Sequence, residues 1–176
     1  WIGCVFGVVA LMWSHVPFSF LFGFTVLSHL LGLLLFLGLI FGCTFYKMKK
    51  TGDFPHPLQG WKEKLTKSEQ LLIVVLFLFM LFAAICLFNH TLFDVEGNYL
   101  TGQCTYGDMN FHLGIITSIA EQGTFPPDYS IFPGAKLDYY FFCDSVSSSL
   151  LIFGSGLRGA YILPMLFGFA LTFCGF

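Results

Sequence analysis

Charged side chains are scarce in this sequence. Only 10% of the 176 residues are Asp, Glu, Lys or Arg, whereas a soluble domain has about 25%. The formal net charge is −2, so no basic surface is available for nucleic acid and we expect no nucleic-acid partner. Hydrophobic residues make up 56% of the chain, and its mean hydropathy is +0.79. This composition is typical of an integral membrane protein.

Cysteine patterns that bind metals are missing as well. The six cysteines form no C-x-x-C pair and no Cys/His cluster, so neither a zinc site nor a disulfide framework is indicated. Most of them lie in or beside apolar runs, where a free cysteine behaves as a small hydrophobe. The first residues also lack the basic leader and the cleavage site of a signal peptide.

Long apolar runs dominate what is present. A membrane-spanning helix needs about 20 apolar residues, and the runs predict an all-α polytopic membrane protein with about five transmembrane helices. Both ends of the chain lie inside apolar runs, so we expect a fragment of a longer protein, truncated at its C-terminal end. The predicted helices occupy residues 1–13, 18–46, 70–92, 137–153 and 160–176.

Lysines define the predicted orientation. Six of the eight basic residues fall within the loop 47–69, and the positive-inside rule makes such a loop cytoplasmic. The N-terminal transmembrane region 1–92 therefore ends outside the cell membrane. Residues 93–136 are predicted to form an extracytoplasmic loop, and the C-terminal region 137–176 to begin with a helix that returns inward. On this scheme Arg158 is cytoplasmic.

The extracytoplasmic loop is predicted to contain a short helix. Over residues 109–122 the apolar side chains Met109, Leu113, Ile116 and Ala120 share one helical face, which favours an amphipathic helix lying at the membrane interface. Gly123 ends this helix, and the Pro-Pro pair after it imposes an extended run.

Asp108 and His112 are the first candidate site residues. Their four-residue spacing projects both side chains from one face of a helix, where they can bind a divalent cation or act together as a base on a hydroxyl group. Asp108 also stands where an N-cap belongs. Asp94 and Glu96 are weaker metal candidates, because acidic residues are common in any solvated loop. The residues leave the cofactor open, with a divalent cation as one option.

Asp144 is the second candidate, because an ionised carboxylate inside an apolar span is costly unless it is paired or faces water. Tyr140, Asp144 and Ser148 recur at four-residue intervals and predict a polar stripe. This stripe can form the wall of a hydrophilic cavity, or Asp144 can bond across tightly packed helices. His29 lies in the second predicted span. It can serve as a proton relay or ligand, or it can bond to a neighbouring helix. The bond to a neighbouring helix is the favoured prediction.

A family resemblance rests on the run GDMNFHLGIITSIAEQGTFPPDYSIFPGAKLDYYFF. It resembles the first outer loop of GT-C-type membrane glycosyltransferases, and it is similar to a loop of the YYY-signature prokaryotic membrane family. Many GT-C members carry adjacent acidic residues where this chain has Gly107 and Met109 beside its aspartate. The matching positions are Asp108, His112, Phe125, Pro126, Pro127, Gly134, Tyr139 and Tyr140.

The resemblance implies a transferase that takes a sugar from a polyprenyl-phosphate donor at the extracytoplasmic face. Asp108 would then act as the catalytic base or a metal ligand, with His112 beside it. We also expect Lys136, Tyr139, Tyr140 and Asp144 to contact the substrate, Lys136 either by neutralising the phosphate or only as an interfacial anchor. The partners implied are the lipid-linked donor and membrane lipid.

Two other functions fit the sequence. A multi-spanning transporter or flippase-like subunit would use a polar pathway around Asp144, and a scaffold would have no site at all. The sugar, the acceptor and the oligomeric state are not encoded in any recognisable pattern.

Overall fold

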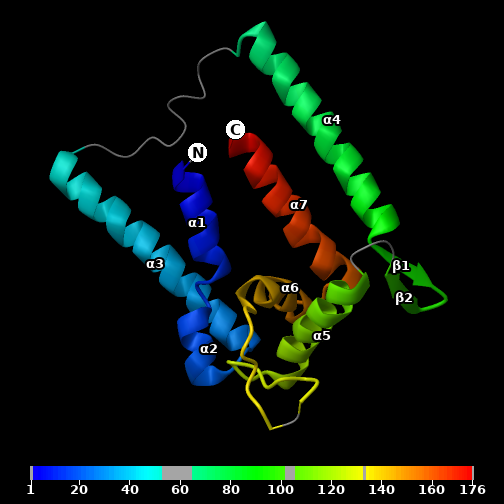
Figure 1. Ribbon diagram of the computed structural model, residues 1–176. Helices are drawn as coiled ribbons and strands as arrows, with labels where there is room; N and C mark the ends of the chain where they lie inside the picture. The colour runs from blue at the N-terminus through cyan, green and yellow to red at the C-terminus, as the bar shows by residue number, and fades with distance from the viewer. Residues whose placement is uncertain (1, 53–64, 102–105, 133, 176) are drawn as a thin grey trace.

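The computed structural model describes residues 2–52, 65–101, 106–132 and 134–175. These residues are mostly helical, as predicted, with one small β-hairpin (Figure 1). The elements are α1 (Ile2–Met12), α2 (Val16–Phe22), α3 (Val26–Thr51), α4 (Lys67–His90), β1 (Leu92–Val95), β2 (Asn98–Thr101), α5 (Tyr106–Gln122), α6 (Phe142–Ile152) and α7 (Leu157–Gly175).

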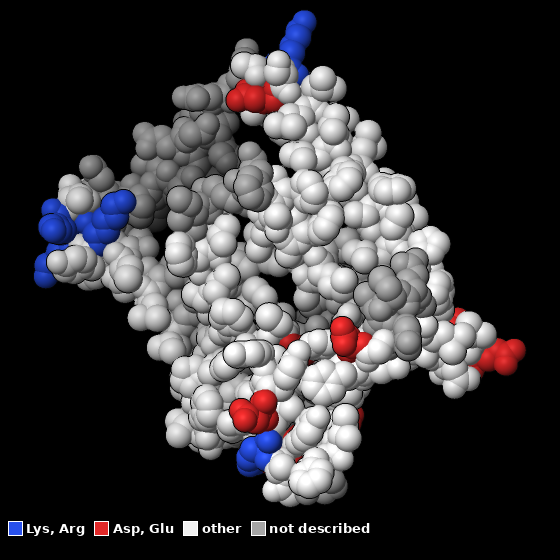
Figure 2. Space-filling view, viewed as in Figure 1, with Lys and Arg blue, Asp and Glu red and all other residues white. Residues whose placement is uncertain are grey.

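Three helical stretches are long and apolar enough to cross a membrane: Gly3–Phe22, Val26–Thr51 and Lys67–His90. Two other apolar helices, Phe142–Ile152 and Leu157–Phe173, are shorter. A helical membrane protein is therefore supported, whereas the predicted count of five spans is not. In Figure 2 the blue basic atoms gather mainly at the ends of α3 and α4 that border residues 53–64, and most red acidic atoms lie toward the opposite end.

The predicted single helix over residues 18–46 is wrong, because the chain breaks between α2 and α3. Gly23 has φ 74°, and a Cβ atom built there would lie 2.3 Å from the carbonyl oxygen of Gly123. The next residue, Phe24, donates its backbone N–H to that same oxygen at 2.6 Å. Thr25 then caps α3 by accepting the Ser28 N–H. The break thus fastens this corner to the end of α5.

α4 begins with a capping box and ends in the hairpin. The Thr66 hydroxyl accepts the Glu69 N–H, and the Glu69 carboxylate accepts the Thr66 N–H at 2.7 Å. Beyond His90, strands β1 and β2 are joined by the two-residue loop Glu96–Gly97, whose φ values are 52° and 82°. Positive φ at both positions is what a type I′ turn requires. The sequence analysis did not predict this hairpin.

α7 runs antiparallel to α4, which changes the predicted path of the chain. Near the start of α7, Arg158 donates to the carbonyl oxygen of Phe88, close to the hairpin end of α4. Near the end of α7, Phe169 and Phe173 lie 6.0 and 4.8 Å from Phe79, measured between ring centroids. The segment before α7 therefore does not carry the chain back to the lysine-rich end, and the predicted placement of Arg158 at that end is wrong.

The short length of α6 explains why the chain does not return to the lysine-rich end before α7. Residues 137–141 are not helical, and α6 has only 11 residues, a length of about 16 Å at 1.5 Å per residue. The hydrocarbon core is about 30 Å thick, so the helix is too short to cross it. Hydrophobicity over 137–153 predicted a span, but the helical part is shorter and buries Asp144, Ser145, Ser147 and Ser148.

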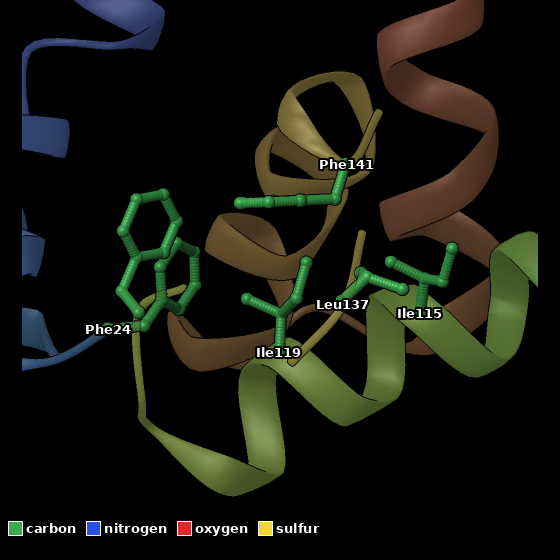
Figure 3. Close-up of a cluster of buried hydrophobic side chains, with 6 residues drawn as sticks. Phe24, Ile115, Ile119, Leu137 and Phe141 are labelled. Carbon is green, nitrogen blue, oxygen red and sulfur yellow. The ribbon is translucent and has the colours of Figure 1, made fainter. Parts of the chain in front are cut away.

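A buried cluster joins the corner at Phe24 to α5 and to the start of α6 (Figure 3). Met109 and Ile116, both on the predicted apolar face of the α5 helix, are 3% and 1% exposed. The predicted helix is therefore present, although it starts at Tyr106 and its apolar face packs against the protein itself. The members of the cluster are Phe24, Ile115, Ile119, Phe125, Leu137 and Phe141.

Candidate functional site

His112 on α5 and Asp144 in the first turn of α6 meet where these two helices pack together. The Nδ1 atom of His112 lies 3.0 and 3.2 Å from the two carboxylate oxygens of Asp144. The two residues are 32 positions apart in the sequence. The turn after α5 and the Pro-Pro segment bring α6 back against α5, so the contact depends on the tertiary fold.

The geometry of this pair assigns the proton on the imidazole ring. An ionised carboxylate only accepts hydrogen bonds, so Nδ1 carries the hydrogen and donates it to Asp144. In the neutral ring, Nε2 is then left with a lone pair. The side chain of His112 is 32% exposed and that of Asp144 only 10%. The pair therefore combines a buried carboxylate with an imidazole that reaches the surface.

Burial also changes the acidity of Asp144, which lies outside the three candidate spans. Desolvation raises the pKa of its carboxyl above the ordinary value of 3.8, and the hydrogen bond and charge of His112 lower it in part. His112 thus offsets part of the cost of burying the charged carboxylate of Asp144.

Serines on α6 hold this helix against its neighbours. The Ser148 hydroxyl donates to the backbone carbonyl of Ile116 on α5 at 2.9 Å. Ser149 lies 2.8 Å from Nε2 of His29 on α3. The favoured prediction for His29, a histidine bonded to a neighbouring helix, is therefore confirmed. His29 also stacks on His15, with a distance of 4.1 Å between ring centroids.

Tyr139 lies beside His112, and Tyr140 lies beside Tyr139. The ring of Tyr139 is 6.0 Å from that of His112, and the ring of Tyr140 is 6.1 Å from that of Tyr139. Tyr139 is 46% exposed and Tyr140 is 93% exposed. Tyr140 precedes the start of α6, so the predicted helical stripe includes Asp144 and Ser148 but not Tyr140. An exposed aromatic pair thus begins at the imidazole with Tyr139 and extends away from it to Tyr140.

Asp108 has a different place from the one predicted. It lies exposed in the first turn of α5, as the third residue of the helix, so it is not the N-cap. Within the described residues, no hydrogen bond joins Asp108 to His112, whose Nδ1 contacts Asp144 instead. The predicted Asp108–His112 pair is therefore replaced by a His112–Asp144 pair, with Asp108 one helical turn before His112.

Lys136 is occupied by another contact. Its Nζ atom lies 2.6 Å from a carboxylate oxygen of Asp128, and the same two residues form a short antiparallel bridge. The loop between them is thereby closed at its base. A positive charge that is already paired is less available to a phosphate group.

Asp94 and Glu96 belong to the hairpin turn. The Asp94 carboxylate accepts the N–H of Gly97 at 3.0 Å, and Glu96 occupies the turn itself. Among the residues that the structure describes, no group of three or more His, Cys, Asp or Glu side chains is arranged to hold a metal ion. The acidic pair therefore serves the turn.

Sequence reasoning identified both His112 and Asp144 but did not join them. The signal that was available is a buried aspartate with no basic residue near it in the sequence, which requires a partner from another element. An aspartate that orients an imidazole is the arrangement that enzymes use for general-base catalysis.

Comparison of the chain with protein-family models, curated proteins and solved structures gives no match.

Proposed function

We propose that the protein is a membrane glycosyltransferase in which His112 is the general base and Asp144 orients it. The donor is a sugar linked to a polyprenyl phosphate, and the acceptor is a hydroxyl group that arrives from water at the extracytoplasmic face. The observation that carries this proposal is the bond from His112 Nδ1 to the buried Asp144, because it directs the lone pair of Nε2 away from the carboxylate.

The reaction requires one proton acceptor. As the acceptor oxygen forms its bond to the anomeric carbon, its proton moves to Nε2 of His112. The bond between the anomeric carbon and the phosphate oxygen breaks, and the electron pair leaves with the phosphate. Asp144 stabilises the imidazolium that results, as a carboxylate does in other His-based catalytic sites.

The residues around the pair support a carbohydrate substrate. Tyr139 offers an exposed ring with a hydroxyl group next to the imidazole, and the exposed ring of Tyr140 lies against that of Tyr139. Asp108 is exposed one turn before His112, where its carboxylate can accept hydrogen bonds from sugar hydroxyls. These three side chains are the proposed substrate contacts. For Lys136 to bind the phosphate, it would first have to leave Asp128.

The direct test is transfer of radiolabelled sugar from polyprenyl-phosphate donors, measured in membranes that contain the full-length protein. We expect His112→Asn to reduce transfer by about 100-fold or more, to a low but measurable rate, at an unchanged protein level. The matched control is His90→Asn at the exposed end of α4, which should leave transfer intact. Equal rates in wild type and His112→Asn would refute the proposal, as would the absence of transfer from every donor supplied to the wild type.

A transport function is the second candidate. The observation in its favour is the row of polar contacts between helices formed by His15, His29 and Ser149, because polar groups inside a membrane protein often line a pathway. Transport predicts that His29→Ala stops solute uptake into liposomes while sugar transfer is not detected. Glycosyl transfer predicts the opposite result for these two assays.

A further inference from the structure

The contact between Ser148 and Ile116 repeats the contact between Asp144 and His112 one turn further along both helices. Ser148 follows Asp144 by four residues, and Ile116 follows His112 by four. Each contact joins residues that are 32 positions apart. α5 and α6 are therefore linked by two polar contacts in the same register.

Because the contact between Ser148 and Ile116 is buried, the serine hydroxyl must find its acceptor within the interface. Ser148 is 0% exposed and Ile116 is 1% exposed, so within the packed interface the serine hydroxyl has backbone carbonyls as its acceptors. Its Oγ atom lies 2.9 Å from the carbonyl oxygen of Ile116 and 3.0 Å from that of Asp144. A serine hydroxyl carries a single proton, which is shared between one carbonyl on each helix.

This arrangement constrains where the Asp144 carboxylate points. If α6 slipped along α5 by one residue, the helix would advance about 1.5 Å and each side chain would rotate by about 100° around the axis. Either movement breaks the contact of Asp144 with His112 Nδ1 and leaves the Ser148 hydroxyl without its partner on α5. The two contacts therefore form or break together.

We propose that Ser148 is a positioning residue, which sets the register of α6 on α5 so that Asp144 faces Nδ1 of His112. Ser148 does not touch a reacting atom, and it acts through Asp144. The inference rests on the proposed function in one respect only: the change in the imidazole matters for a reaction if His112 is the base. The effect of Ser148 on the imidazole itself can be observed without any reaction.

Ser147 provides a matched control. It lies next to Ser148 on α6 and is only 5% exposed, yet in the described part of the chain its side chain takes no part in a hydrogen bond like that of Ser148. Ser147→Ala removes the same atom from the same helix as Ser148→Ala. A difference between the two variants therefore isolates the contact with α5.

The experiment uses the full chain in lipid nanodiscs with isotopically labelled histidine, and NMR of the ring nitrogens reports the tautomer of His112. We expect the Nδ1–H form to dominate in the wild type and in Ser147→Ala. In Ser148→Ala the Nε2–H form should appear beside it. In the transfer assay, Ser148→Ala should lower kcat about tenfold or more with little change in KM, because small displacements of a catalytic group are costly.

If Ser148→Ala does not fold, Ser148→Cys keeps nearly the same volume with a weaker donor and should shift the tautomer in the same direction. A folded variant at Ser148 with the wild-type ring-nitrogen signals would overturn the inference, as would an equal shift in Ser147→Ala. A tautomer shift in a protein that transfers no sugar would support the positioning role while the proposed function fails.

Discussion

Arg158 and Phe88 lie against each other, which fixes the direction of α7 relative to α4. The guanidinium carbon of Arg158 is 5.6 Å from the centre of the Phe88 ring, and the same side chain donates to the backbone carbonyl of Phe88. A cation near the last carbonyls of a helix also interacts favourably with the helix dipole. Because Phe88 is near the hairpin end of α4, residues 153–156 lie at that end too.

Cysteine labelling tests this arrangement in the membrane. In a background whose native cysteines are replaced by serine, Ser155→Cys should react with a membrane-impermeant maleimide from the same side as Ser130→Cys. Thr51→Cys, near the lysine-rich loop, should react only from the other side. If Ser155→Cys reacted from the same side of the membrane as Thr51→Cys, residues 137–153 would cross the membrane inward, as hydrophobicity predicted.

Gly32 is predicted to be essential for the packing of the turn between α1 and α2 on α3. A Cβ atom at this position would lie 2.6 Å from the Cα and N atoms of His15. Gly32→Ala should therefore destabilise the protein by about 1–3 kcal/mol, as overpacking does, and lower the melting temperature in detergent. Gly38→Ala on the same helix meets no atom within 4 Å and should be neutral or stabilising. Equal melting temperatures for the two variants would contradict this close approach.

The pKa of Asp144 predicts a pH dependence of stability. Its value in the folded protein is raised above the ordinary 3.8, so the folded state binds the proton more tightly than the unfolded chain does. The contribution to stability is complete below the ordinary value and is lost as the pH rises through the raised one. Relative to Asp144→Asn, the wild type should therefore lose melting temperature as the pH rises through this window. If the melting temperature of the wild type instead rose relative to that of Asp144→Asn over this pH window, the pKa of Asp144 would be lowered in the folded protein, and the prediction would be wrong.

Asp108 is expected to act in binding. Because His112 is the proposed base and Asp108 is exposed one turn away, a hydrogen bond that the Asp108 carboxylate accepts from a sugar hydroxyl would be present both before and during the reaction. Asp108→Asn should raise KM severalfold and leave kcat nearly unchanged, since loss of such uniform binding has this effect. A loss of kcat as large as that of His112→Asn would return Asp108 to the role of base.

Local patterns in the sequence predicted the helices well. Apolar runs located α1, α4 and α7, and the apolar face of residues 109–122 located α5 to within three residues at its start. These elements depend on nearest neighbours along the chain. The run over residues 18–46 was predicted as one helix, where the chain forms α2 and α3. The break at Gly23 could not be predicted, because its cause is the carbonyl of Gly123, which is one hundred residues away.

His112 and Asp144 were both named as candidates from the sequence, but the contact between them was not predicted. Spacing brought Asp108 and His112 together, because only contacts within one helix can be read from a sequence. The actual partner of His112 lies on another helix, and hydrophobicity had assigned that helix to a full span. Its short length and its buried serines became visible only when α6 was seen to pack on α5.

The most direct test of the central claim is a double-mutant cycle on His112 and Asp144 in the sugar-transfer assay. Residues that act as one catalytic unit show strongly non-additive effects. The account predicts that His112→Asn and Asp144→Asn each reduce the transfer rate and that the double variant is no slower than the slower single variant. Independent effects that multiply in the double variant would contradict a catalytic pair.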